Sequence, residues 1–567
     1  MSTAKHHDGA TQQPLDPTVR AEAIAQHFDV SSEILSRGTE HFVKQLGDGL
    51  LQDGTTLLQV PSYVTKLPNG LEKGVSLAID LGGTNLRVCS VELHGDSTHT
   101  LTQSKTAIPA DLMTSKTYKS LFDFIARHTE AFMQKHMPKQ LASWRRITMD
   151  GKVTDELRRQ HLHSLGFTFS FTFDQHAINK GTLMYWTKAF SIEDAIGRDP
   201  CAMLQESLDS LHLPLEVAAL VNDTVGTLAA RAYASPGHSE TLLGAIFGTG
   251  TNGAYVERIQ NIKKLHAQPE FSKADSAEFM ALNTEWGGFD NELSVLPITI
   301  YDEALDGASV NPDDQHFEKR ISGLYLGEIL RRVVLIEMQS TTPIFKMTVP
   351  LTSSLHLPYS IDSSFLSALV RDQSPGLESA QEEIVKILDA SQVSVKDAAA
   401  LQIIAASIGR RAARLSAIAI AGIVVQSGRL NSRSEKAEIA KRPVARKSLL
   451  ARLLSSFRRA HSSFVRCVRR WLVKSKDEPK ATDEEASDSG YASSVGQDEP
   501  SQEEGIIDIG VDGSLFEFFP GFEAHIRIAL KEIPAIGIEG EKLIRMGAAA
   551  DGSGVGAALI AWASTKS

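Results

Sequence analysis

The chain contains 567 residues, a length that allows about two to four domains. Its hydrophobic fraction of 42% and its charged fraction of 22% are ordinary for a globular protein, so they exclude a mostly disordered chain, a collagen-like repeat and a disulfide scaffold. The formal net charge of -11 excludes a protein built to coat nucleic acid, although it leaves room for a local basic patch.

Cysteine usage and hydropathy predict a soluble, cytoplasmic protein. Cys89, Cys201 and Cys467 are too few and too scattered for a disulfide framework or a zinc site, which favours a reducing compartment. The segment 1–16 has no apolar core, so we expect no secretory signal there. The best apolar stretch, 415–425, is much shorter than the roughly 20 residues that a bilayer requires, so we expect no integral membrane segment.

The N-terminal part is predicted to alternate between helices and strands. In chain order, we expect a disordered arm at 1–18, helices at 21–28 and 31–51, a strand hairpin at 76–80 and 86–92, a helix at 120–135 and an irregular basic stretch at 139–159.

The later strands each end in a turn rich in glycine or aspartate. The expected elements are strands at 164–171, 218–222 (followed by a helix) and 242–247, the turn 248–250, and strands that end at 512–514 and 551–554. Strands interleaved with helices predict an α/β protein. Turns of this kind at several strand ends predict a ligand site built from loops at the edge of a sheet.

The segment 428–505 interrupts this pattern. Its first part, 433–476, is basic and amphipathic, and could be a nuclear-localisation or nucleic-acid patch, a membrane-surface helix, a target for a protein partner, or simply a solvated helix or loop. Its second part, 477–504, is acidic and rich in serine, and we expect it to be disordered because it has few apolar residues to bury.

The first strand hairpin carries a turn with the chemistry of a phosphate site. Gly82 and Gly83 allow backbone N–H groups to approach an anion, and Arg87 offers a guanidinium for a phosphoryl oxygen. Thr84 adds a hydroxyl, and Asp80 could hold Mg²⁺ through water. An ordinary hairpin turn is the alternative interpretation. Three further glycine turns after strands, at 248–252, 512–514 and 551–554, favour the phosphate interpretation.

Carboxylates and amides suited to a polyhydroxy ligand follow other strands. Asp223, beside Asn222, could act as a general base on a hydroxyl, although an Asx turn or helix N-cap explains the same pair. Glu285 and Glu318 could accept hydrogen bonds from hydroxyls, or be surface acids in salt bridges. The segment 185–188 offers the Thr187 hydroxyl and the Lys188 cation, or an interfacial aromatic patch with a surface lysine.

Taken in order, these segments resemble the eukaryotic hexokinase–glucokinase family, and most of all its fungal glucokinase-like members. The resemblance covers 32–427 and 506–563. The segments that carry it are Leu77–Val88, Leu165–Phe171, Trp186–Lys188, Val221–Thr227, Phe247–Gly250 with Asn252, Asn283–Gly287, Phe317–Lys319, Asp362–Ser367 and Asp551–Ala558.

The resemblance implies a two-lobed, actin-like ATPase (ribonuclease H-like) α/β fold with a cleft between the lobes. The large lobe would comprise 19–74 and 221–549, with the insert 428–505, and the small lobe 75–220 and 550–567. The implied reaction is ATP-dependent, Mg²⁺-assisted phosphorylation of a glucose-like hexose at its 6-hydroxyl.

The resemblance also assigns roles to residues. Asp223 would be the general base, with Lys188 and Arg87 as further catalytic groups. The hexose would be held by Asp174, Thr187, Lys188, Asn222, Asp223, Asn252, Glu285 and Glu318. The nucleotide would be held by Asp80, Gly82, Gly83, Thr84, Asn85, Arg87, Gly248, Thr249, Ser363, Ser367, Gly513 and Ser514, with Asp80 also on the metal.

The chain departs from the family pattern where the sugar would bind. After Phe171 the family usually continues with proline, a small residue and a hydroxyl residue, but here the run is Thr172-Phe173-Asp174. Asp174 would add a carboxylate to the sugar site, and crowded carboxylates raise one another's pKa. Ala189 and Asp313 each replace a glycine. The alternative function is therefore a catalytically weak hexokinase-like regulator in nutrient signalling or transcriptional control, located in the nucleus or at an organelle surface through the basic insert.

Overall fold

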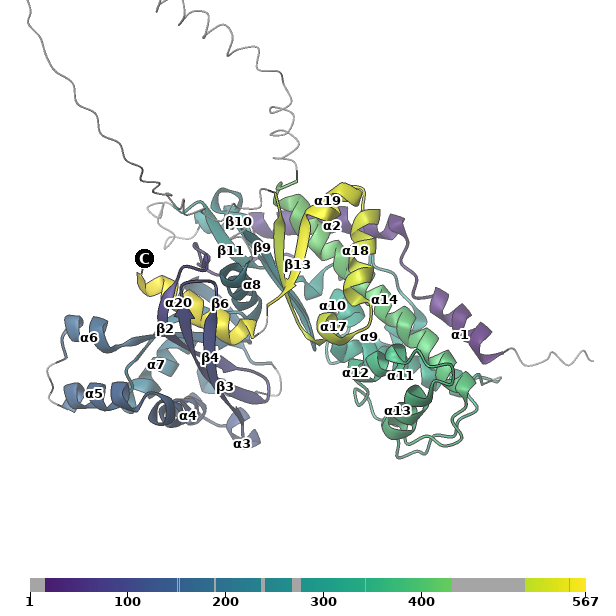
Figure 1. Cartoon of the computed structure of the whole chain (residues 1–567), viewed down its shortest axis with the longest axis horizontal. Coiled ribbons are helices and arrows are strands. Elements are labelled where there is room, and N and C mark those ends of the chain that lie inside the picture. Colours follow the sequence, from purple (N-terminus) through teal and green to yellow (C-terminus); the bar gives the residue numbers. More distant parts are fainter. Residues whose placement is uncertain are drawn as a thin grey trace, which may run out of the picture. The chain divides into compact units, whose positions relative to one another are not determined.

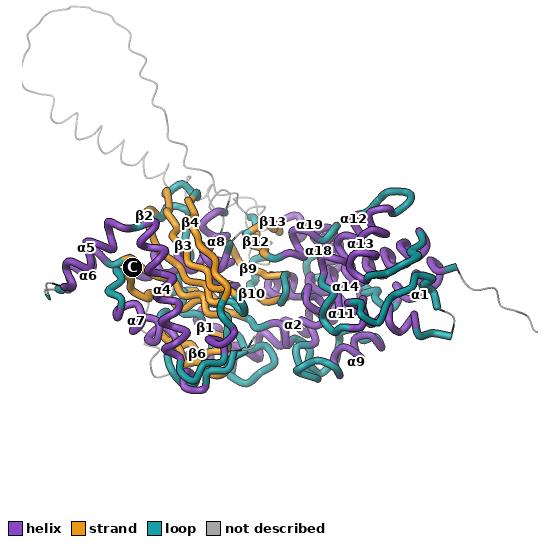
Figure 2. Tube along the Cα trace, turned by 90° about the horizontal axis from the view of Figure 1, so that it is seen from below, coloured by secondary structure: helices purple, strands orange, loops and turns teal. Residues whose placement is uncertain are grey.

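The computed structural model describes residues 16–149, 151, 153–187, 190–235, 240–267, 277–341, 343–430, 505–549 and 551–566. The chain divides into one compact unit, 1–428 with 502–567, and a second unit, 429–501. The described residues belong almost entirely to the first unit, in which helices pack around β-sheets (Figures 1 and 2). The predictions for the arm at 1–18 and for the insert at 428–505 lie almost wholly outside the described residues.

The first sheet has five strands in the order β4-β3-β2-β5-β8. They are β2 (Lys73–Leu81), β3 (Asn85–His94), β4 (His99–Ala107), β5 (His163–Phe169) and β8 (Leu215–Val221). Strands β2 to β4 are antiparallel, whereas β5 pairs in parallel with β2 and β8.

Side chains alternate between the two faces of this sheet because successive residues of a strand point in opposite directions. Leu77 and Ile79 of β2 belong to a core shared with α4 (Tyr118–His136) and α7 (Pro200–Ser210). Ala78 belongs to a second core, shared with α8 (Asp223–Ala234) and α20 (Ala557–Lys566). Helices therefore cover both faces of the sheet.

The second sheet has six strands in the order β1-β11-β10-β9-β12-β13. They are β1 (Val60–Pro61), β9 (Thr241–Phe247), β10 (Thr251–Arg258), β11 (Phe279–Asn283), β12 (Ile507–Asp512) and β13 (Ile544–Ala548). Helix α8 also packs against β9 and β12, so it contacts elements of both sheets.

Helix α14 (Val395–Gln426) is a common packing partner of several other helices. It packs against α1 (Pro17–Gln26), α2 (Ser32–Leu51), α12 (Ser363–Arg371) and α18 (Phe522–Glu532). Further helices are α3 (Ala110–Met113), α9 (Ile300–Gly307), α10 (His316–Ile321), α11 (Gly323–Met338), α13 (Glu378–Leu388), α17 (Ser514–Phe518) and α19 (Gly537–Leu543). The apolar stretch 415–425 is the end of α14, and no described helix is long and apolar enough to cross a membrane.

Two sequence-based expectations were wrong. The basic stretch 139–159 is not irregular, because α5 (Pro138–Met149) buries Leu141 and Trp144 on one face and α6 (Asp155–His161) follows it. The predicted strand 164–171 ends at Phe169. The chain then forms an unpredicted hairpin of β6 (Thr172–Ala177) and β7 (Lys180–Tyr185).

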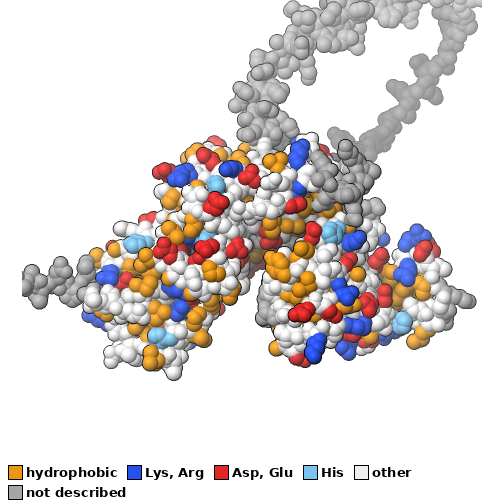
Figure 3. Space-filling model, turned by 180° about the vertical axis from the view of Figure 1, so that it is seen from behind, with side chains coloured by type: hydrophobic (Ala, Val, Ile, Leu, Met, Phe, Trp, Pro, Cys, Tyr) orange, Lys and Arg blue, Asp and Glu red, His pale blue; other side chains and the backbone are white. Residues whose placement is uncertain are grey.

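Charged side chains of both signs are interspersed on the face of the molecule drawn in Figure 3, with hydrophobic side chains scattered among them. Mixed charges of this kind are the usual surface of a globular protein and do not by themselves mark a binding face.

Candidate active site

The first predicted phosphate turn, 82–84, joins β2 to β3 and is held by the C-terminal segment. Gly82 N–H donates to the Asn85 carbonyl at 3.0 Å, which closes the turn. The Asp80 carboxylate accepts from Ser553 Oγ at 2.9 Å and lies 3.6 Å from Arg87 Nη2. Arg87 Nη1 in turn donates to Asp551 at 2.8 Å. The predicted turns at 80–87 and 551–554 are thus one cluster.

Asp512 connects this cluster to β12. Burial raises the pKa of Asp512, and the nearby Asp551 carboxylate raises it further, whereas the N–H groups of Gly513 and Gly552 and the Arg87 guanidinium oppose the rise. We predicted the turn 512–514 but assigned no role to Asp512. Its position at a strand end, like that of Asp80, is the signal that could have identified it.

Gly248 and Gly513 bring two further turns together. Gly513 has φ +113°, and a Cβ on it would lie 2.5 Å from the carbonyl carbon of Phe247. A Cβ on Gly248 would lie 3.6 Å from Gly513 Cα. A side chain at position 513 would therefore be strained and would also clash, so the backbone of both turns stays uncovered.

The predicted nucleotide residues Thr249, Ser363 and Ser367 lie around the same turns. Leu324 N–H donates to the Thr249 carbonyl at 3.1 Å. A Cβ on Gly323 would lie 2.9 Å from both Gly248 O and Ser363 Oγ, so Ser363 also borders the turn. Ser367 Oγ donates to the Ser363 carbonyl at 2.9 Å and is largely buried. Its hydroxyl is therefore committed to α12. Ser514 is the exposed first residue of α17.

Asn252, Glu285 and Glu318 gather at the start of β10. Glu285 adopts a left-handed backbone (φ 52°) and accepts from Asn252 Nδ2 at 3.2 Å and from Asn283 Nδ2 at 2.5 Å. Glu318 Oε2 accepts from the backbone N–H of Thr251 at 3.0 Å. Asn283 therefore belongs to this network. The sequence analysis included it in the motif Asn283–Gly287 but did not assign it to the site.

Asn222 and Asp223 lie where β8 ends and α8 begins. Asn222 Oδ1 accepts from Thr224 N–H at 2.9 Å, so the N-cap interpretation of Asn222 is confirmed. Asp223 is the first residue of α8 and accepts from the same N–H at 2.9 Å.

The first turns of α8 lie directly against the phosphate cluster and β9. A Cβ on Gly226 would lie 2.6 Å from the Gly552 carbonyl oxygen, and a Cβ on Gly244 of β9 would lie 2.8 Å from the Thr224 carbonyl oxygen. These backbone contacts place Asp223 next to the segment that binds Asp80 and next to the strand that leads to Gly248.

The predicted sugar residues Asp174 and Thr187 lie around the β6–β7 hairpin. Asp174 is exposed, and it interacts electrostatically with the Lys264 ammonium. Burial lowers the pKa of Lys264, and the carboxylates of Asp53 and Asp174 oppose this decrease. Thr187 is half-buried. Lys188 and Ala189 lie outside the described residues, so the prediction for Lys188 has no structural counterpart.

Aromatic packing accommodates Phe173, which stands where the family usually has a small residue. Its ring lies 6.1 Å from that of Phe169, and Phe169 also contacts Phe171 and Trp186. Trp186 stacks on Phe190 and donates to the Ile192 carbonyl at 2.9 Å. The large side chain therefore extends an aromatic cluster.

Comparisons with known proteins decide the family. Models of the hexokinase family match residues 20–233 and 242–563. The chain belongs to the hexokinase family. It is 42% identical over 555 residues to a glucokinase of Aspergillus niger (96% of this chain, 97% of that protein) and 35% identical over 564 residues to glucokinase-1 of Saccharomyces cerevisiae (95% and 96%).

Solved hexokinase structures share the fold. The hexokinase of Schistosoma mansoni complexed with glucose matches with a TM-score of 0.68 and 27% identity, over 97% of this chain and 100% of that one. The predicted actin-like α/β fold is confirmed, and the chain is a phosphotransferase of the hexokinase and glucokinase type.

Proposed function

We propose that this hexokinase transfers a phosphoryl group from ATP, with Mg²⁺, to the 6-hydroxyl of a glucose-like hexose, and that Asp223 is the general base. The observation that carries the proposal is the convergence of four turns on the start of α8. The Asp80 turn is bonded to the 551–553 segment, that segment packs against α8, and Asp512 joins both to the Gly248–Gly513 contact.

The residues present suit a nucleotide phosphate chain and its metal. Asp80, Asp512 and Asp551 supply oxygen ligands of the kind that Mg²⁺ prefers. The uncovered backbone of Gly248 and Gly513 suits close approach of an anion. Magnesium, when bound, would neutralise phosphate charge, and Arg87 would do the same. The Thr84 hydroxyl and the backbone N–H groups of Gly83, Thr84 and Ser514 would donate hydrogen bonds to phosphate oxygens.

The hexose side relies on positioning. Glu285, Glu318 and Asn252 present acceptors and a donor at the start of one strand, so they could hold several hydroxyls in a fixed geometry. Asp223 would accept the proton of the reacting hydroxyl, whose alignment supplies much of the rate in phosphoryl transfer. We propose that Asn222, Thr187 and Lys188 complete this set.

We also propose that the five-stranded and six-stranded sheets belong to the small and large lobes at the predicted boundaries, 75–220 with 550–567 and 19–74 with 221–549. Ligand-driven closure of the lobes would exclude water from the reacting groups. The predicted roles of the insert 433–476 and the cytoplasmic location stay predictions.

Gly513→Ala should damage the nucleotide site. Alanine disfavours the φ of +113° and its Cβ would meet the Phe247 carbonyl, so the turn must move away from Gly248. We expect the KM for ATP to rise about tenfold or more, which corresponds to a loss of at least 1.4 kcal/mol of binding. Steady-state kinetics with ATP varied at saturating glucose measures this effect.

Gly47→Ala is the matched control for this glycine substitution, because a Cβ at Gly47 of α2 has no atom within 4 Å. It should leave the KM for ATP unchanged. An unchanged KM in Gly513→Ala would show that the 513–514 turn does not contact the nucleotide.

Asp174 should not prevent catalysis. Its exposed carboxylate has Lys264 as a neighbour, so replacing it changes a surface charge and not a buried network. The wild-type chain should produce glucose 6-phosphate at the turnover of ordinary kinases, about 1–100 s⁻¹. The double variant Thr172→Pro and Asp174→Ser should change kcat by about twofold or less, because Asp174 is exposed and neither residue belongs to the networks around Asp223 and Glu285. An inactive wild type whose activity this variant restores would instead favour the regulatory alternative.

A further inference from the structure

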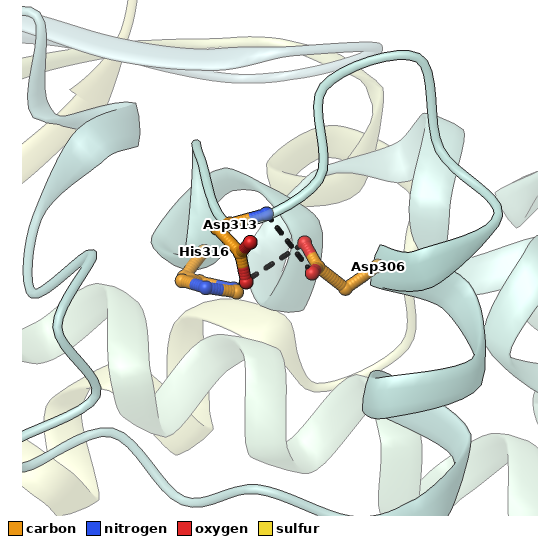
Figure 4. A group of neighbouring side chains, drawn as sticks. All are labelled: Asp306, Asp313 and His316. Carbon is orange, nitrogen blue, oxygen red and sulfur yellow. Dashed lines mark hydrogen bonds and ion pairs between the residues drawn. The ribbon is translucent and has the colours of Figure 1, made fainter.

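A second group of ligand-type side chains lies on the connection between α9 and α10. Asp306 is near the end of α9, Asp313 is in the loop and His316 is the first residue of α10. One ligand atom from each residue lies within 4.8 Å of the other two. Figure 4 shows the three side chains pointing toward one another.

His316 supplies an observation that an acidic cluster alone would lack. The residue is 4% exposed, and its Nδ1 has no hydrogen-bond partner among the described residues. The Asp306 carboxylate oxygen Oδ1 lies 3.7 Å from this nitrogen, beyond hydrogen-bonding distance. A buried polar atom without a partner is costly, so a ligand that engages it would be stabilising.

The charge of the cluster also favours a cation. Two carboxylates are present, and one ammonium, Lys319 Nζ, lies 2.6 Å from Asp306 Oδ1. Lys319 pairs with one of the two carboxylates, and the exposed Asp313 opens the cluster to solvent.

We propose that Asp306, Asp313 and His316 bind a divalent transition-metal ion of the Zn²⁺ class. An imidazole nitrogen with two carboxylates suits zinc or its neighbours, whereas Mg²⁺ prefers oxygen ligands alone. Ligands of tetrahedral zinc lie about 3.4 Å apart, so the widest separation in the group must shorten by up to about 1.4 Å. Asp313 is an exposed loop residue and is the one free to move; water would complete the coordination.

The place of this site gives it a consequence for the hexose, which rests on the proposed function. Glu318 is two residues after His316 on the same helix, and its carboxylate accepts from Thr251 N–H. A metal ion bound to the start of α10 would hold the helix that presents Glu318, and so would alter the affinity for the hexose.

The direct test is metal binding by the untagged full-length chain after treatment with a chelator. Co²⁺ is the spectroscopic probe and Zn²⁺ the competitor. We expect one equivalent of Co²⁺ with visible absorption bands, its displacement by Zn²⁺, and a rise in Tm with either ion. Saturating Mg²⁺ should not displace Co²⁺.

Two ligand variants and one control decide the assignment. Asp313→Gly should lose the bands and the Tm rise while its metal-free Tm stays at or above that of wild type, because glycine adopts the φ of 61° found at Asp313 without strain. His316→Leu should lose both as well. Glu303→Gln, an exposed acid of α9 outside the cluster, should keep both.

Absence of Co²⁺ bands in wild type, or full binding by both ligand variants, would overturn the proposal. Loss of the Co²⁺ bands in Glu303→Gln would also overturn the proposal, because the binding of Co²⁺ would then depend on general surface charge. None of these measurements contains hexose or ATP, so their failure leaves the kinase function untouched, and an inactive kinase leaves the metal result untouched.

Discussion

Asp223→Asn is expected to lower kcat for hexose phosphorylation by about 10²- to 10⁴-fold, the usual contribution of a positioned general base. The amide cannot take up the hydroxyl proton. It can still accept the hydrogen bond from Thr224 N–H, so the start of α8 should be preserved. A coupled assay for glucose 6-phosphate measures kcat, and calorimetry with glucose should show binding close to that of wild type.

Glu216→Gln is the matched control for the base, because Glu216 is an exposed carboxylate on β8, the strand that leads to Asp223. It should retain wild-type kcat. If Asp223→Asn kept the wild-type turnover, the assignment of the base would be contradicted. If the variant lost both glucose binding and turnover, Asp223 would have a role in binding.

Arg411→Met is expected to destabilise the fold by about 3–5 kcal/mol, because it leaves a buried carboxylate without its cation. Arg411 of α14 is fully buried and forms a two-pronged pair with Asp302 of α9, at 2.7 and 2.9 Å. The free energy of unfolding in urea measures the loss. Arg410→Met is the control, since Arg410 pairs with Asp29 on the surface and should contribute at most about 1 kcal/mol.

Two further measurements test the origin of that loss. In the double variant Arg411→Met and Asp302→Asn, the destabilisation should be smaller than the sum of the two single effects. Burial acts to raise the pKa of Asp302, but Arg411 and Arg320 hold it below the usual 3.8. The pair therefore stabilises wild type fully above about pH 4, and this contribution disappears as the pH falls through the lowered pKa. In Arg411→Met this dependence should become weaker or change sign, because only Arg320 among the two arginines then opposes the effect of burial on the pKa of Asp302.

The regular parts of the fold could be predicted because local signals determine them. The apolar runs before Gly82, Asp223 and Gly248 were predicted as strands, and the structure confirms each of them. The β6–β7 hairpin escaped prediction because Gln175 is buried by long-range contacts. Its amide donates at 3.1 Å to the carbonyls of Ser62 and Leu220, which no local pattern reveals.

The candidate site could be predicted in its members but not in its connections. Asp80, Glu285 and Asp223 end strands or follow them, and such positions are visible in the sequence. The role of Asp512 depends on its distance from Asp551, and the cationic neighbour of Asp174, Lys264, is distant in the sequence. Both therefore required the fold.

The packing of helix α8 affects how the two sheets can move relative to each other. The backbone of its first turns packs directly against the backbone of Gly552 and against that of Gly244. No side chain separates the backbones at either contact, so neither contact can adjust by a change of rotamer. In the lobe closure that we propose, we expect the two sheets to turn about this helix. A residue at the pivot is displaced least, so the carboxylate at its tip can stay fixed while the groups around it close.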